Sequence, residues 1–190
     1  MEMTMEERCR NIVNDCLGSK EVNPVKIFYK LAGKSYIRIH GPEHHILDGA
    51  CVMTAFYNAG GSVDLKKGLE SLMEEGLKMP GATCGLWGVC GSVSSVGAAL
   101  AIIEETGPLS QDQTFGMHMV CTSNALQKMS QIGGPRCCKR HAFIAMKEGV
   151  MYLNQRFSLS MPYEDIKCGY SAQNEQCLKV KCPFYIGGVL

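Results

Sequence analysis

The chain has 190 residues, of which 46% are hydrophobic and 19% charged, a globular composition that excludes intrinsic disorder. Nineteen Lys and Arg against 18 Asp and Glu give a formal net charge of +1, which argues against nucleic acid or a membrane surface as a partner. The outlier is cysteine, with 11 residues, an odd number that excludes complete internal pairing. No secretory signal opens the chain, so we expect a cytoplasmic protein with metal-binding or reactive thiols.

The first half of the chain is predicted to be mostly helical. Residues 3–17 predict a short helix, and residues 22–39 predict a linker with at most one strand, in the segment YIRIH. Apolar residues at a 3.6-residue period predict a helix from Pro42 to Gly60 and an amphipathic helix from Asp64 to Lys78.

A glycine-rich turn at 80–91 is followed by an apolar helix predicted from Ser92 to Glu105. The segment from Met79 to Ile103 has no charged residue and is long enough to cross a membrane. Its glycines and serines, however, favour a buried helix with a small-residue face, so we expect no membrane span.

Two more helices and an irregular segment complete the prediction. Ser110 and Gln113 resemble a capping box that begins a helix ending at glycines 133–134, and Pro135 begins a last helix reaching about Arg156. The predicted fold is mainly α, a single compact helical domain with a cysteine-rich irregular C-terminal segment. Within it, residues 1–37 form the N-terminal helix and linker, and residues 38–190 form the cysteine-rich part.

The first thiol motif is CGLWGVCG, with Cys84 and Cys90 on either side of a turn at a helix start. Glycines at 85, 88 and 91 allow backbone N–H groups to approach a bound group, so Gly85, Gly88 and Gly91 are candidate cofactor-binding residues. A helix N-terminus stabilises a thiolate, a cluster sulfide or an anion. The alternative is a tight turn with two buried cysteines.

The second thiol motif is GGPRCCKRH, with vicinal Cys137 and Cys138 in the first turn of a helix. Positive charge comes from Arg136, Lys139, Arg140 and His141. Charge and helix dipole together predict at least one thiol that is largely thiolate near neutral pH. Vicinal side chains on a helix point about 100° apart, so one cysteine is expected to bind metal and the other to pack beside it. A basic helix start facing an acidic surface is the alternative.

The third thiol motif lies in the C-terminal segment, where Cys168, Cys177 and Cys182 precede Pro183. The spacing and the final Cys-Pro resemble cluster-ligand runs, although no Cys-x-x-Cys is present. Zinc is the other metal that takes thiolates at variable spacing. A segment this polar would in either case be held in place by its metal.

A fourth constellation places His44 and Asp48 four residues apart on one helix face, with Cys51 a turn further. This geometry suits a metal site or an imidazole that a carboxylate orients as a general base. Solvated histidines at a helix start are the alternative. The chain has no phosphate-binding loop, dinucleotide fingerprint, zinc-protease motif or serine-hydrolase motif, so nothing supports nucleotide binding or serine hydrolysis.

Together, HGPEHHILDGA, CGLWGVCGSVSSVGAA, GGPRCCKRHAF and the run from Cys168 through CPF resemble the uncharacterised DUF5714 family, over roughly residues 38–186. The resemblance implies the cytosol of methanogenic archaea or anaerobic bacteria, where oxygen-labile clusters survive, and so favours iron–sulfur over zinc. It points to the same seven cysteines as the spacing and leaves Cys9 and Cys16 as incidental.

Two hypotheses follow. In the first, the protein is an iron–sulfur enzyme of lyase or sulfur-transfer type, whose [4Fe–4S] cluster has an open iron and acts on an anionic or thiol-containing small molecule. The expected metal ligands, gathered around one cavity, are Cys84, Cys90, Cys137, Cys168, Cys177 and Cys182. The expected catalytic residues are Cys138 as reactive thiol, His44 held by Asp48 as proton shuttle, and Arg136 as anion holder. In the second, zinc or a cluster holds together a module that binds a methyltransferase or corrinoid protein. A homodimer is compatible with both.

Overall fold

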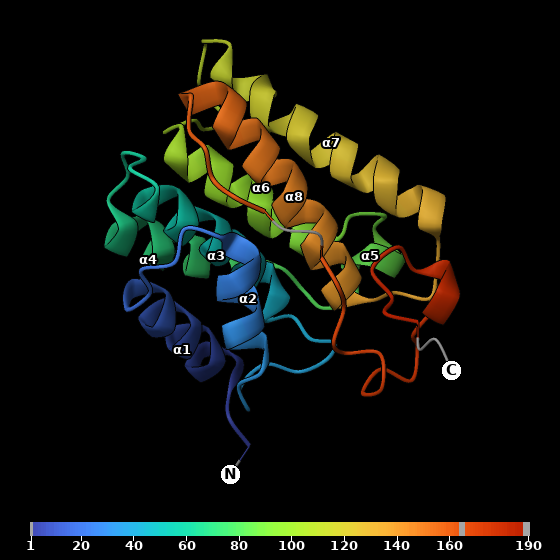
Figure 1. The fold of residues 1–190 in the computed structure, drawn as a ribbon. Coiled ribbons are helices and arrows are strands. Elements are labelled where there is room, and N and C mark those ends of the chain that lie inside the picture. Colours follow the sequence, from blue (N-terminus) through green and yellow to red (C-terminus); the bar gives the residue numbers. More distant parts are fainter. Residues whose placement is uncertain (1, 164–165, 188–190) are drawn as a thin grey trace.

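The computed structural model describes residues 2–163 and 166–187, and these contain eight α-helices (Figure 1). The helices are α1 (Met5–Leu17), α2 (Pro24–Ala32), α3 (His44–Asn58), α4 (Leu65–Lys78), α5 (Thr83–Leu86), α6 (Gly91–Ile103), α7 (Thr114–Ile132) and α8 (Cys138–Phe157). No strand forms in the described ranges, so the predicted single helical domain is confirmed. Residues 164–165 and 188–190 of the predicted cysteine-rich part lie outside the described residues.

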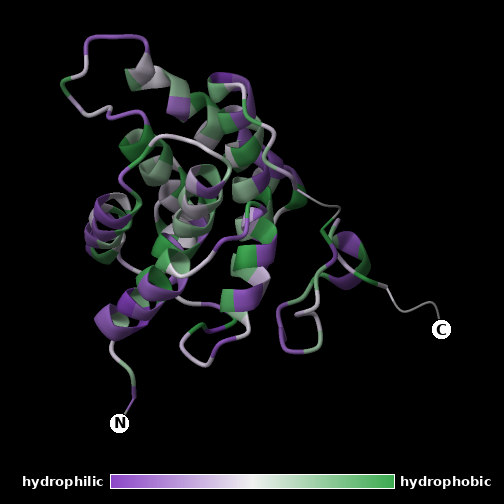
Figure 2. Cartoon of the chain, turned by 60° about the vertical axis from the view of Figure 1, so that its left-hand side comes forward, coloured by the Kyte–Doolittle hydropathy of each residue, from purple (hydrophilic) through white to green (hydrophobic). Residues whose placement is uncertain are grey.

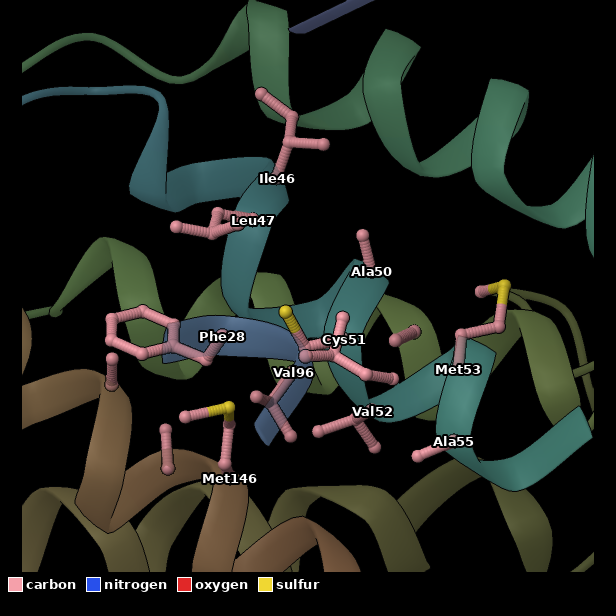
Figure 3. Packing of buried hydrophobic residues seen from close by; sticks show 14 of the residues in the cluster. Phe28, Ile46, Leu47, Ala50, Cys51, Val52, Met53, Ala55, Val96 and Met146 are labelled. Atoms are coloured by element: carbon pink, nitrogen blue, oxygen red, sulfur yellow. The ribbon is translucent and has the colours of Figure 1, made fainter. Parts of the chain in front are cut away.

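Helix α3 is the centre of the fold, because every residue from His44 to Phe56 is buried. It packs against α1, α2, α4, α6 and α8. Figure 3 shows its apolar side chains beside Phe28 of α2, Val96 of α6 and Met146 of α8. A helix that is apolar on all sides needs neighbours on all sides, which sets the arrangement of the other helices.

The outer helices are amphipathic. In α4, Leu65, Leu69 and Leu72 are buried on one side, as their period predicts, whereas Lys78 and Glu75 form an exposed ion pair. Figure 2 shows hydrophilic and hydrophobic residues alternating along the helices, as expected for amphipathic helices around a shared core.

The closest helix contact joins α3 to α6. The Gly49 N–H donates to Ser95 Oγ at 2.9 Å, and a Cβ at Gly49 would lie 2.2 Å from the Ser95 carbonyl oxygen. The small residues of α6 therefore serve close helix packing, and most of the helix is buried, as predicted. No helix in the described ranges has the length and apolarity needed to cross a bilayer.

The predicted linker at 22–39 is wrong, because half of it is helix α2. The Asn23 side chain accepts hydrogen bonds from the N–H groups of Val25 and Lys26, and Pro24 occupies the first turn. The segment YIRIH is irregular, and its Tyr36 and Ile37 belong to the core. The alternating apolar residues of this segment favour a strand, but no strand forms in residues 2–163 and 166–187 to pair with it.

Two predicted helix starts also differ. The predicted capping box is absent: Ser110 Oγ accepts instead from the Gly107 N–H at 2.9 Å, and α7 begins at Thr114. Helix α8 begins at Cys138 rather than at Pro135, because Cys137 is its N-cap residue.

The C-terminal segment, residues 166–187, is called the tail below. Its regular structure is one 3-10 helix, η1 (Lys179–Lys181), and one parallel bridge between Cys168 and Tyr185. In Figure 1 the tail is red and lies at the end of the helical bundle where α8 begins and α5 sits.

Candidate metal centre and adjoining thiol groove

Four cysteines line one small cavity between the start of α8 and the tail. They are Cys137, Cys168, Cys177 and Cys182, and this cavity is called the thiol cavity below. Three come from the tail and one from the N-cap of α8. The structure thus brings together the whole third motif and one member of the second, as four free thiols.

N–H donors point at three of these sulfurs. The backbone N–H groups of Tyr170 and Lys179 donate to Cys168 Sγ at 3.4 Å and to Cys177 Sγ at 3.3 Å. In both cases the donor lies two residues after the cysteine. Donors to sulfur stabilise negative charge on it, and they accompany thiolates that ligate metal clusters.

Cys137 Sγ accepts from two donors, the Arg140 N–H in the first turn of α8 and the Asn174 side-chain amide, each at 3.4 Å. Asn174 is in turn oriented by His40, whose Nε2 lies 2.9 Å from Asn174 Oδ1. The Cys138 N–H donates to His40 Nδ1 at 3.4 Å, so Nε2 carries the imidazole proton and donates to the amide oxygen. His40 and Asn174 thus form a second layer behind the sulfur, which sequence reasoning missed because they lie 134 residues apart.

Aromatic contacts hold the tail against the bundle. Phe184 packs edge-on against Phe143 of α8 at 5.3 Å, and Tyr170 stacks on Tyr29 of α2 at 6.2 Å. The Cys168 N–H donates to the Phe184 carbonyl at 2.7 Å, which closes the tail on itself. The three tail cysteines are therefore fixed relative to Cys137 by packing as well as by backbone contacts.

In residues 2–163 and 166–187, no three His, Cys, Asp or Glu side chains are close enough together to hold a single metal ion. One zinc ion needs its four sulfurs about 2.3 Å from a common point. In a [4Fe–4S] cluster each cysteine binds a different iron, so the sulfurs stand farther apart. The thiol cavity has a volume of about 10 Å³, so its four thiols would have to move apart to hold a cluster.

Cys84 and Cys90 do not line the thiol cavity, so the single cavity expected from the sequence is in fact divided. They line two adjoining cavities of about 550 and 270 Å³ on the other side of the α8 start. Four residues line both cavities: Cys84, Cys90, Arg136 and His141. These two cavities together are called the thiol groove below. The volume of the larger cavity is in the range of small-molecule sites, and that of the smaller lies just below it.

The vicinal cysteines separate the two sites, since Cys137 lines the thiol cavity and Cys138 the smaller part of the thiol groove. This agrees with the expected divergence of their side chains. The predicted thiolate is not found, because burial raises the pKa of Cys137 and raises that of Cys138 to about 12. The basic neighbours do not compensate: Lys139 and Arg140 are themselves buried and bonded to carbonyl oxygens elsewhere.

Cys90 is paired with a histidine that the sequence did not link to it. Cys90 is the N-cap residue of α6, and its Sγ lies 3.2 Å from His141 Nδ1 on α8. Arg140 Nη2 lies 3.4 Å from His141 Nε2, and a guanidinium only donates, so Nδ1 carries the proton and donates to the sulfur. Burial nevertheless raises the pKa of Cys90 to about 11, so the chain alone keeps it protonated.

The motif glycines have different roles. Gly85 and Gly88 line the larger part of the thiol groove, with nothing in contact with the position of a Cβ. Gly88 also has φ of 70°, which favours glycine. Gly91 instead makes room for a neighbour, because a Cβ there would lie 2.0 Å from the His45 ring. All three candidates line the thiol groove, and the space beside Gly85 and Gly88 is open.

His44 and Asp48 form the predicted i, i+4 pair, with His44 Nδ1 3.1 Å from Asp48 Oδ1. Both are buried, and His44 Nε2 lies 3.1 Å from the ammonium of Lys139. Because Lys139 donates to Nε2, Nδ1 carries the proton and donates to the carboxylate. His44 thus has both ring nitrogens occupied, which leaves no lone pair for the predicted proton shuttle.

These features define an all-helical, cysteine-rich protein with four thiols around one cavity and a thiol-lined groove beside it. The chain belongs to the DUF5714 family, a family of unknown function, whose model matches residues 12–185. The match begins earlier than the resemblance at 38–186 and includes Cys16 but not Cys9; both are fully buried in the core. No curated protein and no solved structure matches the chain.

Proposed function

We propose that the protein binds a [4Fe–4S] cluster through Cys137, Cys168, Cys177 and Cys182. The observation that carries this proposal is the thiol cavity itself: four free thiols from two distant parts of the chain line one space, and three of the sulfurs accept N–H donors. Four thiolates are the usual complement for such a cluster. Eleven free cysteines accord with a reducing cytoplasm, which is part of the same proposal.

Four thiol ligands leave no iron open to a substrate, so the proposal differs from the open-iron enzyme expected from the sequence. The cluster holds the tail in place and is a candidate electron carrier. The small-molecule chemistry of an enzyme would then belong to the thiol groove, whose lining includes Cys84, Cys90 and Cys138.

The test is reconstitution under anaerobic conditions, followed by measurement of iron, acid-labile sulfide and visible absorbance. Wild-type protein should hold four irons and four sulfides per chain. Cys→Ser substitution of Cys137, Cys168, Cys177 or Cys182 should remove most of them. Cys84→Ser and Cys90→Ser are matched controls from the neighbouring groove and should retain the full content.

Other results would contradict the proposal. One zinc per chain without sulfide would favour the metal-stapled module instead. Loss of iron in Cys84→Ser or Cys90→Ser, with retention in the tail variants, would move the metal centre to the thiol groove. Protein that cannot be reconstituted with any metal would refute a metal centre altogether.

A further inference from the structure

Three long helices begin at the wall of the smaller part of the thiol groove. Residues at the starts of α3, α6 and α8 line it, namely His44, Gly91 and Cys138. These helices have 15, 13 and 20 residues, so each turns the positive end of its dipole toward this space, although the first N–H groups of α3 and α8 already have acceptors within the protein. No Asp or Glu in the described ranges lines either part of the groove. The field in this space therefore favours an anion.

A cation at the rim adds an independent contribution. Arg136 is exposed, lines both parts of the groove and has no carboxylate partner among the described residues. The other arginine of the lining, Arg38, is already paired with Glu43 at 2.7 Å. Arg136 is thus the side chain whose charge is available to a ligand, and a guanidinium suits carboxylate or phosphate oxygens.

Cys90 is the thiol best placed to meet such a ligand. It lies with Cys84 where the two parts of the groove adjoin, whereas Cys138 lines the smaller part alone; Cys84 is more exposed, but Cys90 is the one whose sulfur contacts a histidine. Its sulfur is held by the 3.2 Å contact with His141 Nδ1, and the backbone N–H groups of Ser92 and Val93 act to lower its pKa, although burial outweighs them. Donors on the sulfur stabilise the thiolate that forms when the proton leaves.

We propose that the thiol groove binds a small anion between Arg136 and the N-termini of α3, α6 and α8, and that Cys90 Sγ attacks an electrophilic carbon carried by this anion. The carbon–sulfur bond forms as the bond from that carbon to its leaving group breaks. The leaving group departs with the bonding pair, and the thiol proton goes to water in the groove. This site shares no residue with the proposed cluster ligands, so either proposal can fail without the other.

The test uses iodoacetate, an anionic electrophile, and iodoacetamide, its neutral analogue, on the protein as purified. Peptide mapping by mass spectrometry follows alkylation of Cys90 over time. Glutathione, treated in the same way, gives the ratio of iodoacetate to iodoacetamide rates for a free thiol. At Cys90 the ratio of iodoacetate to iodoacetamide rates should exceed that of glutathione. Arg136→Gln should lower the iodoacetate rate at Cys90 about tenfold and change the iodoacetamide rate less than about twofold. Arg10→Gln, an exposed arginine of α1 outside the groove, is the matched control and should change neither.

Three outcomes would overturn the proposal. Cys90 could resist both reagents in the folded protein, which would make it an inert core thiol. The ratio of iodoacetate to iodoacetamide rates at Cys90 could equal that of glutathione, both in wild type and in Arg136→Gln, which would refute an anion site. Alkylation that appears only after a chelator has removed bound metal would make Cys90 a metal ligand instead of a nucleophile.

Discussion

The buried chain of polar groups from Lys139 through His44 to Asp48 gives the sharpest prediction about stability. Lys139 is fully buried, and its ammonium donates to His44 Nε2 at 3.1 Å and to the Arg38 carbonyl at 3.0 Å. It also lies over the Phe28 ring, 5.6 Å from the centroid. Asp48 is also fully buried, so this cation offsets a charge that water does not reach.

Lys139→Met keeps the length of the side chain but removes the charge and both hydrogen bonds. Each hydrogen bond from a charged group contributes about 1.5–3 kcal/mol, so the two bonds of Lys139 together contribute about 3–6 kcal/mol. We therefore expect the free energy of unfolding to fall by about 3–5 kcal/mol. Domains of this kind have about 5–15 kcal/mol in total, so the variant should be marginal.

The assay is urea unfolding followed by circular dichroism, on samples of matched iron content. Lys78→Met, which removes a lysine paired with Glu75 on the surface, should change stability by less than about 0.5 kcal/mol. The double variant Lys139→Met/Asp48→Asn should lose less stability than the sum of the two single variants, by at least about 1 kcal/mol, because both residues bond to His44 in one chain of polar groups. A Lys139→Met protein within about 0.5 kcal/mol of wild type would refute the buried-charge reasoning.

Three further predictions concern packing, pH and the cluster. Gly49→Ala should destabilise the protein by more than about 2 kcal/mol in urea unfolding, because the new methyl group would collide with the backbone of Ser95. Gly116→Ala, on α7 where the space is open, should stabilise it by about 0.5–1 kcal/mol. Similar values for the two variants would contradict the close α3–α6 contact. Burial lowers the pKa of His45 below its usual 6.5, so the unfolded chain binds more protons below that pH. The free energy of unfolding should thus decline as the pH falls below about 6.5, and it should decline less steeply in His45→Gln. Parallel curves of stability against pH for wild type and variant would exclude His45 as a cause. Asn174→Leu removes a donor to Cys137 Sγ and should make the reduction potential of the proposed cluster more negative in a redox titration of reconstituted protein. An unchanged potential would exclude this hydrogen bond as a determinant.

The long helices could be predicted because their signals are local. The apolar period of α3 and α4 and the glycines after α3 and α7 determine those elements within a few residues. Helix α2 is not predicted, although Asn23-Pro24 is a good helix start, because the alternation in the following YIRIH favours a strand. Local alternation cannot show that a strand has no partner.

The candidate site was predictable in its parts and not in its arrangement. The spacing indicated the tail cysteines and Cys137 as ligands, and the structure places these four together. That Cys84 and Cys90 belong to another cavity depends on the path of the tail, which no local pattern encodes. The same holds for the contact between Cys90 and His141, which lie 51 residues apart. The prediction of a thiolate at Cys137 or Cys138 fails because burial raises the pKa of both thiols, and burial, a property of the whole fold, outweighs the neighbouring positive charge.

The division of Cys137 and Cys138 between two sites makes the spacing of this segment as important as its composition. One residue more between them would rotate everything after it by about 100° around α8. A cysteine would still follow Cys137 two positions on, yet it would no longer face the groove, and His141 would turn away from Cys90. The stretch from the cis peptide at Gly134–Pro135 to His141 is therefore expected to accept substitutions more readily than insertions or deletions. Single-residue insertions and deletions placed one at a time along this stretch would show which positions fix the thiol cavity and the thiol groove relative to each other.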